Sequence, residues 1–246
     1  MILIPQIKNI KKKISGKISF NESLSKLSWF NLGGPAKILY RPKNLQELSI
    51  FLKEVKGAEV IKILGAGSNT LVRDGGFNGV IIKFGKSFSH ISLFDPNTII
   101  AGASILDKNV SSFALENSLS GFEFLSCIPG TIGGAVRMNS GCYGEEISKI
   151  LVSLQVMDFK GNIKIIQSPD IKFHYRGSNL DENLIYISAT LRGKKDDMLN
   201  IKNKINNFVS KKKLLNPKKL KHAEVLLKIQ KMKKLGNSLK ILVVQG

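Results

Sequence analysis

Residues 121–144, GFEFLSCIPGTIGGAVRMNSGCYG, constrain the fold of this chain more than any other stretch. Glycine and serine are interleaved there with apolar residues spaced for burial, a combination that a flexible linker does not carry. These apolar residues are Phe122, Phe124, Ile128, Ile132 and Val136. Gly130, Gly133 and Gly134 precede an apolar helical pattern, and glycine there lets the backbone approach a ligand and present amides to an anion. The segment predicts either a phosphate-binding turn or a tight turn between buried elements.

A second glycine-rich segment favours the phosphate-binding interpretation. Residues 60–69, VIKILGAGSN, run as a strand into a loop of small residues, and a strand-like run, IIKF, follows at residues 81–84. A strand, a small-residue loop and a further strand are typical of a ligand-binding edge. The loop is not the dinucleotide fingerprint G-x-G-x-x-G, because Asn69 and Thr70 stand where a helix with a third glycine should begin. A Rossmann domain is therefore disfavoured.

Four distinctive sequence motifs follow one another along the first two hundred residues. They are WFNLGGPA at 29–36, GAGSNTLVRDGG at 65–76, the segment at 121–144, and YRGSNL at 175–180. Together they resemble the UDP-N-acetylenolpyruvoylglucosamine reductase family, flavoenzymes of cell-wall precursor synthesis. The resemblance implies an α+β fold with an FAD-binding domain of the vanillyl-alcohol-oxidase (PCMH) type.

The resemblance also assigns roles to individual residues. In the family the two glycine loops hold the pyrophosphate of FAD and the start of the isoalloxazine site, and the Arg of the YR pair lies in the active site. Arg176 is therefore the expected catalytic residue, and Tyr175 is expected to contact the substrate or to lend structure. No metal site is expected. The expected FAD-binding residues are Gly65, Ala66, Gly67, Ser68, Asn69, Thr70, Gly130, Thr131, Gly133, Gly134, Asn139 and Gly141.

The reaction implied by the resemblance has two halves. NADPH reduces FAD, and hydride then passes to the enolpyruvyl double bond of UDP-N-acetylglucosamine enolpyruvate, giving UDP-N-acetylmuramate. Because negative charge develops on the α-carbon and its carboxylate, the site needs a fixed cation and a proton donor. The planar guanidinium of Arg176 suits that carboxylate, and a surface salt bridge is the alternative role for this residue. His174 is a second candidate acid, but no partner is visible for it and the family motif does not use that position.

The formal net charge of +20 is a reason to consider nucleic acid as a partner. Lys greatly outnumbers Arg, however, and accompanies abundant Ile and Asn, whose codons are rich in A and T, so genome composition accounts for much of the excess. After Ser210 there are eleven lysines and one acidic residue, Glu224, so much of the excess positive charge lies in the tail. We therefore expect no nucleic-acid partner.

The lack of a recognisable targeting signal and the cysteine pattern make the cytoplasm the expected location. No apolar run approaches the ~20 residues that span a bilayer, so no membrane insertion is expected. The N-terminal MILIPQIKNIKKK has its charge after a short apolar stretch and carries no small-residue cleavage signature, unlike a secretory signal. Cys127 and Cys142 do not have the spacing of metal ligands, and a disulfide between them is not expected in a reducing compartment. Oligomeric state has no signal in the sequence.

Hydrophobic periodicity and turn residues divide the first 209 residues into two subdomains, and the resemblance implies that both bind FAD. The first, residues 1–90, combines predicted strands at 37–40, 60–64 and 80–84 with a helix at 45–55. The second, residues 91–209, combines strands at 98–101, 151–158, 163–166 and 185–191 with helices at 107–117 and 200–208. Each subdomain contributes one glycine loop, so the ligand is expected between them.

After Phe208 the sequence departs from the family pattern. The family continues with a QP element, a GGSxFxNP segment carrying the Ser that donates the proton, and a later Glu, in a third domain that binds the UDP-sugar. Read out of phase, residues 215–230 can encode QPKKI and IKTCGSTFKNP, so we expect a frame change at residues 210–213, where lysine codons can form a run of A. Residues 210–246 are then no domain, the C-terminal substrate domain is missing, and the chain is an impaired reductase fragment. A basic amphipathic surface helix is the alternative for this tail.

Two other functions stay open at this point. One is another FAD-dependent oxidoreductase of the same fold, which the YRGSNL match disfavours. The other is a basic, non-catalytic binder of nucleic acid or membrane surfaces on a relict flavin fold. Flavin content and salt-dependent retention on DNA separate the second from a reductase.

Overall fold

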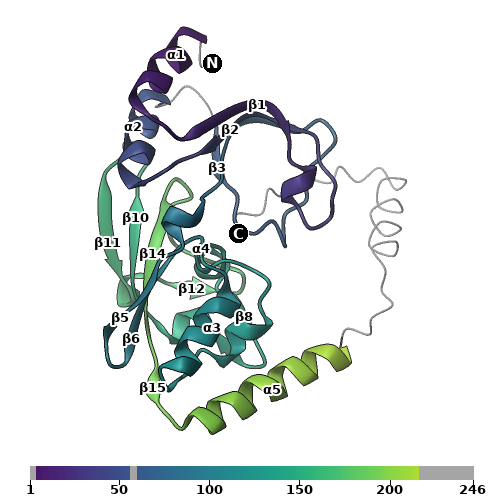
Figure 1. The fold of residues 1–246 in the computed structure, drawn as a ribbon, viewed down its shortest axis with the longest axis vertical. Coiled ribbons are helices and arrows are strands. Elements are labelled where there is room, and N and C mark those ends of the chain that lie inside the picture. The colour runs from purple at the N-terminus through teal and green to yellow at the C-terminus, as the bar shows by residue number, and fades with distance from the viewer. Residues whose placement is uncertain (1–3, 56–59, 216–246) are drawn as a thin grey trace.

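The computed structural model describes residues 4–55 and 60–215, and two sheets organise this part of the chain. We call the four-stranded sheet with α1 and α2 the first lobe, and the five-stranded sheet with α3, α4 and α5 the second lobe. Figure 1 shows the first lobe at the top of the view and the second lobe below it, with α5 along the lower edge.

The first lobe is built on a sheet with strand order β1-β2-β4-β3. β1 is antiparallel to β2, whereas β2, β4 and β3 run parallel. Helix α2 has apolar residues at helical spacing, Leu48, Phe51, Leu52 and Val55, which form one buried face. This face packs on the sheet, and Phe51 stacks on Tyr40 with ring centroids 4.0 Å apart. The bounds are α1 Ile4–Lys13, β1 Lys17–Ser23, β2 Pro35–Arg41, α2 Leu45–Val55, β3 Ile61–Ile63 and β4 Phe77–Ile82.

The second lobe is built on an antiparallel sheet with strand order β11-β10-β14-β6-β5. Leu154, Ala189 and Ala101 lie side by side across β10, β14 and β6, and they join Val110 of α3 and Val136 of α4 in one core. The strands are β5 Ile91–Asp95, β6 Thr98–Gly102, β10 Leu151–Met157, β11 Ile163–Gln167 and β14 Ile185–Arg192. The helices are α3 Asp107–Glu116, α4 Ile132–Arg137 and α5 Met198–Leu215.

Short elements complete the second lobe and the connections. Two-residue strands pair as β7 Leu119–Ser120 with β15 Lys194–Lys195, β8 Gly141–Cys142 with β9 Glu145–Glu146, and β12 Phe173–His174 with β13 Gly177–Ser178. Short 3-10 helices lie at Ser25–Leu27, Lys86–Phe88, Glu123–Cys127, Ile147–Lys149 and Ser168–Asp170.

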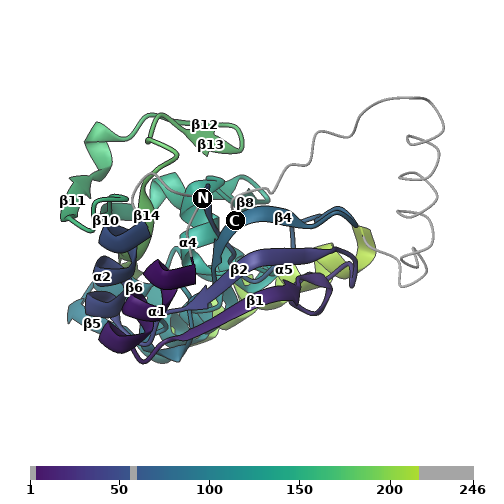
Figure 2. The same ribbon diagram turned by 90° about the horizontal axis from the view of Figure 1, so that it is seen from above.

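The two lobes share a hydrophobic core. Met157, Ile185 and Ile187, from the ends of β10 and β14, are buried in the same cluster as Tyr40 and Phe51 of the first lobe. Figure 1 and Figure 2 both show α2 next to β10. The lobes are therefore packed against each other through apolar side chains and hold a fixed relative position.

Most predicted elements lie at or near their expected positions. Helix α2 has the predicted bounds, and β5 begins at Ile91, where the second subdomain is predicted to start. Helix α1 and strand β1 were not predicted. Helix α5 runs past the predicted end at Phe208 and across Ser210 to Leu215. The rest of the predicted out-of-frame tail, residues 216–246, lies outside the described residues.

Candidate cofactor site

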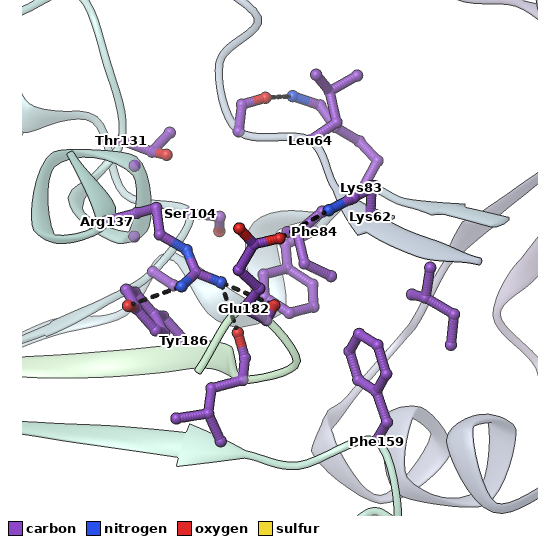
Figure 3. A pocket seen from close by; sticks show the side chains of 17 residues that line it. Lys62, Leu64, Lys83, Phe84, Ser104, Thr131, Arg137, Phe159, Glu182 and Tyr186 are labelled. Atoms are coloured by element: carbon purple, nitrogen blue, oxygen red, sulfur yellow. Dashed lines mark hydrogen bonds and ion pairs between the residues drawn. The ribbon is translucent and has the colours of Figure 1, made fainter. Parts of the chain in front are cut away.

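A cavity lies between the two lobes, at the carboxyl ends of the parallel strands β3 and β4 (Figure 3). Gly65 and Lys83 line it from the first lobe, and Thr131, Gly133 and Gly134 line it from the second. In open sheets, ligands bind at this edge because the loops that leave the strands meet there. The structure thus brings parts of both predicted glycine loops to one cavity, in the expected place.

The first glycine loop, residues 65–69, has backbone N–H groups without protein acceptors. Within residues 4–55 and 60–215, none of these five amides donates a hydrogen bond to the protein. Gly67 has a φ of +74°, and a Cβ there would clash with the carbonyl oxygen of Leu27. Successive amides around a residue of positive φ form a concavity that binds anions. This loop therefore has the backbone geometry of an anion site.

The WFNLGGPA segment supports the first glycine loop from behind. The Trp29 amide donates to the Gly67 carbonyl at 3.0 Å, and the Ser28 hydroxyl donates to the Thr70 carbonyl at 2.8 Å. Both contacts use carbonyl oxygens of the loop, so its amides stay available. Thr70 is buried and does not line the cavity. Two motifs that are far apart in sequence therefore form one support.

The second glycine loop, residues 130–134, uses its amides differently. The Ile132 and Gly133 amides donate to the carbonyls of Ile105 and Ala103 at 3.0 and 2.9 Å. The expectation that the Gly133 amide faces an anion is therefore wrong, because that amide already has an acceptor inside the protein. A Cβ on Gly133 would lie 3.0 Å from the Ala103 side chain, so glycine is needed here for close packing beside the cavity.

A buried acid lies behind the second glycine loop. Asp107, at the start of α3, is fully buried, and neither of its carboxyl oxygens has a hydrogen-bond partner of good geometry within the described part of the chain. A Cβ on Gly130 would lie 2.7 Å from one of these oxygens. Burial raises the pKa of Asp107 well above its ordinary value, and the Gly130 amide only moderates the shift. Gly130 therefore leaves room for the Asp107 carboxyl and does not line the cavity.

Asn139 and Gly141 have local structural partners. The Asn139 side-chain oxygen accepts from the Ser148 amide at 3.1 Å, and Asn139 has a φ of +40°. Gly141 lies in β8 so close to the Glu145 carbonyl of β9 that a Cβ would clash. Neither residue lines the cavity, so their contact with a cofactor stays a prediction.

Three cationic side chains line the cavity, and sequence reasoning missed all of them. Arg137 donates to the carbonyls of Asp181, Glu182 and Leu184 and to the Tyr186 hydroxyl at 3.1 to 3.3 Å. Figure 3 shows its guanidinium next to Tyr186 and Glu182. The signal was present, because Arg137 stands inside the segment at 121–144.

The other two cations come from the first lobe. Lys62 forms an ion pair with Glu182 at 3.5 Å across the cavity. The Lys83 ammonium donates to the Gly65 carbonyl (Figure 3). Burial lowers the pKa of Lys83, and the nearby Arg41 guanidinium lowers it further.

Tyr175 and Arg176 lie apart from the cavity, at the tip of the β12–β13 hairpin. Arg176 has a φ of +61°, uncommon for a residue with a side chain, and its guanidinium carbon lies 5.3 Å from the Tyr175 ring centroid. Tyr175 is 87% exposed, and His174 is exposed beside it. The hairpin therefore presents both predicted residues to solvent.

These residues fit FAD. The cofactor carries a diphosphate, which matches the unpaired amides of residues 65–69 and the buried ammonium of Lys83. Thr131, Gly133 and Gly134 border the same cavity from the second lobe. No group of three His, Cys, Asp or Glu residues suited to a metal is found in residues 4–55 and 60–215.

Comparisons with known proteins agree with this fit. Residues 36–167, just over half of the chain, match the model of an FAD binding domain. The UDP-N-acetylenolpyruvoylglucosamine reductase of Pelagibacter ubique (strain HTCC1062) is 47% identical over 218 residues, which are 89% of this chain and 72% of that protein. The chain belongs to the UDP-N-acetylenolpyruvoylglucosamine reductase family. The reductase of Rickettsia massiliae (strain Mtu5) is 43% identical over 84% of this chain and 68% of its own length.

Solved structures agree with membership of the reductase family. The crystal structure of UDP-N-acetylenolpyruvylglucosamine reductase from Thermus caldophilus has a TM-score of 0.70 at 26% identity, covering 83% of this chain and 71% of that one. BBE-like 1 from Physcomitrella patens shares the fold alone, with a TM-score of 0.55 at 16% identity over 77% of this chain and 44% of its own. The predicted family and the α+β FAD-binding fold of an oxidoreductase are thereby confirmed.

Two further observations bear on earlier expectations. Cys127 and Cys142 are both free thiols. In the described ranges, no helix combines the length and the apolar character needed to cross a membrane.

Proposed function

We propose that this chain binds FAD between its lobes and uses NADPH to reduce UDP-N-acetylglucosamine enolpyruvate to UDP-N-acetylmuramate. The observation that carries the proposal is the cavity that Gly65 of the first loop borders together with Thr131, Gly133 and Gly134 of the second, because the first loop has amides without protein acceptors. The names of its relatives support the substrate. Because NADPH and UDP-sugars are soluble nucleotides, we place the reaction in the cytoplasm.

The cofactor contacts follow from the two loops. Gly65, Ala66, Gly67, Ser68 and Asn69 hold the diphosphate through their amides, and the buried Thr70 supports this loop from behind. Thr131, Gly133 and Gly134 border the flavin side of the cavity. Gly130 gives room to the Asp107 carboxyl behind this surface, and Asn139 and Gly141 are proposed to contact the cofactor. FAD supplies reversible hydride transfer when it is bound.

Arg176 acts on the substrate side. Its guanidinium neutralises the enolpyruvyl carboxylate and the charge that develops beside it, while Tyr175 contacts the substrate. The exposure of both residues on the hairpin supports contact with a ligand that arrives from solvent.

Flavin content and NADPH oxidation with the enolpyruvyl sugar test the proposal. We expect purified protein to be yellow, and Arg176→Ala to lower kcat/KM by at least ~100-fold. The adjacent His174→Ala is the matched control and should change kcat/KM little. A colourless protein that takes up no FAD, or an Arg176→Ala variant equal to His174→Ala, contradicts the proposal.

We also propose that residues after about Ser210 are read out of frame, so that this chain has reduced activity. The helical continuation of α5 to Leu215 does not distinguish the two interpretations, because A-rich DNA encodes lysine and leucine in several frames. Sequencing the DNA for residues 206–246 tests the point. One base more or less near the codons for residues 211–213 supports the frame change, and an unbroken frame contradicts it.

A further inference from the structure

Lys83 stands where two parallel strands end. It follows β4 directly, and its amide bonds to the carbonyl of Tyr40 near the end of β2. On the other side of β4, the chain leaves β3 through Leu64 into the first glycine loop. The Lys83 side chain returns to this loop and donates to the Gly65 carbonyl. Its ammonium therefore lies beside Gly65, the first residue of this loop.

The other cations near this edge are already neutralised or saturated. Arg41 makes two hydrogen bonds to the Glu22 carboxylate at 2.8 and 3.3 Å. Lys62 is paired with Glu182, and Arg137 donates to three carbonyls and one hydroxyl. Lys83 differs, because in residues 4–55 and 60–215 no carboxylate is bonded to it.

A largely buried ammonium with one carbonyl partner is unfavourable without a ligand. The carbonyl satisfies one of three N–H donors and supplies no full negative charge. Burial of a charge is costly unless an opposite charge compensates it. The lowered pKa of Lys83 expresses the same imbalance. An anion bound in the cavity would remove it.

We propose that Lys83 is a cofactor-binding residue whose ammonium, together with the amides of residues 65–69, holds the diphosphate of FAD. This inference rests on the proposed function. A diphosphate carries two negative charges and several acceptor oxygens, which match a compact point charge next to a row of unpaired N–H groups. The flavin ring is neutral when oxidised and has less need of a fixed cation.

The proposal predicts that one substitution raises the stability of the cofactor-free protein and lowers its affinity for FAD. Lys83→Met keeps the length of the side chain and removes the charge, so it should raise the melting temperature of the cofactor-free protein. It should also weaken FAD binding by at least ~10-fold, as expected when one partner of a buried charge pair is removed. Lys86→Met, three residues later on the surface, is the matched control and should leave both quantities unchanged. Lys83→Arg should restore part of the affinity.

The test measures FAD affinity, competition by ADP-ribose, the reduction potential of the bound flavin and cofactor-free melting for these variants of the full chain. ADP-ribose carries the diphosphate without the flavin, so its affinity should fall by the same factor in Lys83→Met, while the reduction potential stays the same. FAD affinity equal to that of Lys86→Met overturns the inference. A shifted potential with unchanged ADP-ribose affinity also overturns it and places Lys83 at the flavin ring.

The remaining outcomes are equally decisive. A Lys83→Met protein that melts at a lower temperature, or fails to fold, shows that Lys83 serves the structure through Gly65 and overturns the inference. If the unaltered chain takes up no FAD, the proposed function fails by itself. ADP-ribose binding to Lys83→Met and Lys86→Met then still decides whether Lys83 holds a diphosphate.

Discussion

Residues 65–69 and residues 130–134 are both glycine-rich turns that border the cavity, yet their backbone N–H groups have different partners. The first loop leaves five amides without protein acceptors in the described part of the chain. In the second loop, the Ile132 and Gly133 amides donate to the segment that follows β6. The first loop accepts a supporting hydrogen bond through the Gly67 carbonyl and leaves its donors without protein partners, whereas the second loop uses two of its donors for support.

The comparison shows that a glycine-rich pattern indicates close approach of the backbone without saying to what. Gly67 approaches the Leu27 carbonyl, and Gly133 approaches Ala103. Only the hydrogen-bond partners separate an anion site from a packing contact. We therefore assign anion binding to the first loop and close packing beside the cavity to the second.

The largest expected effect separates the two loops by the same substitution. Gly67→Ala places a side chain at a positive φ and against the Leu27 carbonyl, so it should lower the free energy of unfolding by about 3 kcal/mol or more. Gly133→Ala meets a side chain at 3.0 Å and should lower it by about 1–2 kcal/mol. Urea denaturation measures both. Gly75→Ala is the control, because no atom lies within 4 Å of the new Cβ. Equal losses of stability in Gly67→Ala and Gly133→Ala would contradict the difference between the two loops.

A smaller effect is expected at the end of the second loop's helix. Arg137→Met removes four hydrogen bonds to the residues that lead into β14, so it should lower the free energy of unfolding by about 2–3 kcal/mol. Arg137→Lys keeps the charge but cannot reach all four acceptors, and it should recover only part of the loss. If Arg137→Lys had the same free energy of unfolding as the unaltered protein, charge alone would matter at this position.

The acid behind the second loop should make stability depend on pH. Between the pKa of ~4 of an exposed aspartate and the raised pKa of Asp107, the folded chain holds a proton that the unfolded chain has released. The free energy of unfolding therefore falls as pH rises through this interval. Asp107→Asn removes the titration, so its melting temperature at pH 8 should lie above that of the unaltered protein.

Melting curves at pH 5 and pH 8 check this expectation. The advantage of Asp107→Asn should shrink toward acidic pH. Asp170→Asn, an exposed acid in the same lobe, should show no such trend. An advantage that is constant with pH would mean that Asp107 does not titrate as its burial requires.

The smallest effect concerns the support of the first loop. Ser28 is buried, and its hydroxyl bonds the Thr70 carbonyl, so Ser28→Ala should lower the free energy of unfolding by about 1 kcal/mol. FAD affinity should fall with it, because the loop loses a support. The exposed Ser87→Ala is the control, and a Ser28→Ala protein with unchanged stability and affinity would contradict this role.

Local patterns predicted the elements, and tertiary contacts decided the site. The helical spacing of Leu48, Phe51 and Leu52 located α2, and the glycine loops located the cavity. Strand β1 was missed because only Ile18 and Phe20 of its seven residues are apolar, and helix α1 was missed although Ile4, Ile7 and Ile10 recur at helical spacing. The acceptors of the Ile132 and Gly133 amides lie in residues 103–105, far from the loop in sequence, so no pattern around residue 133 could reveal them.

The roles of the charged residues near the site could not be predicted from the local sequence either. In the sequence, Lys83 looks like a lysine that ends an apolar strand. Asp107 looks like an acid at the start of a helix, where acids are common. Burial and missing partners distinguish these two residues, and both properties depend on the packing of distant segments. The resemblance located Arg176 on a solvent-exposed hairpin, and its role stays a prediction.

Hydrogen exchange of individual amides, measured with and without FAD, tests the difference between the two loops most directly. The amides of residues 65–69 should exchange rapidly in the cofactor-free chain and become strongly protected when FAD binds. The Gly133 amide should be protected in both states, because it donates to Ala103. Protection of residues 65–69 without FAD, or FAD binding that leaves them unprotected, would contradict the assignment of the first loop as the diphosphate site.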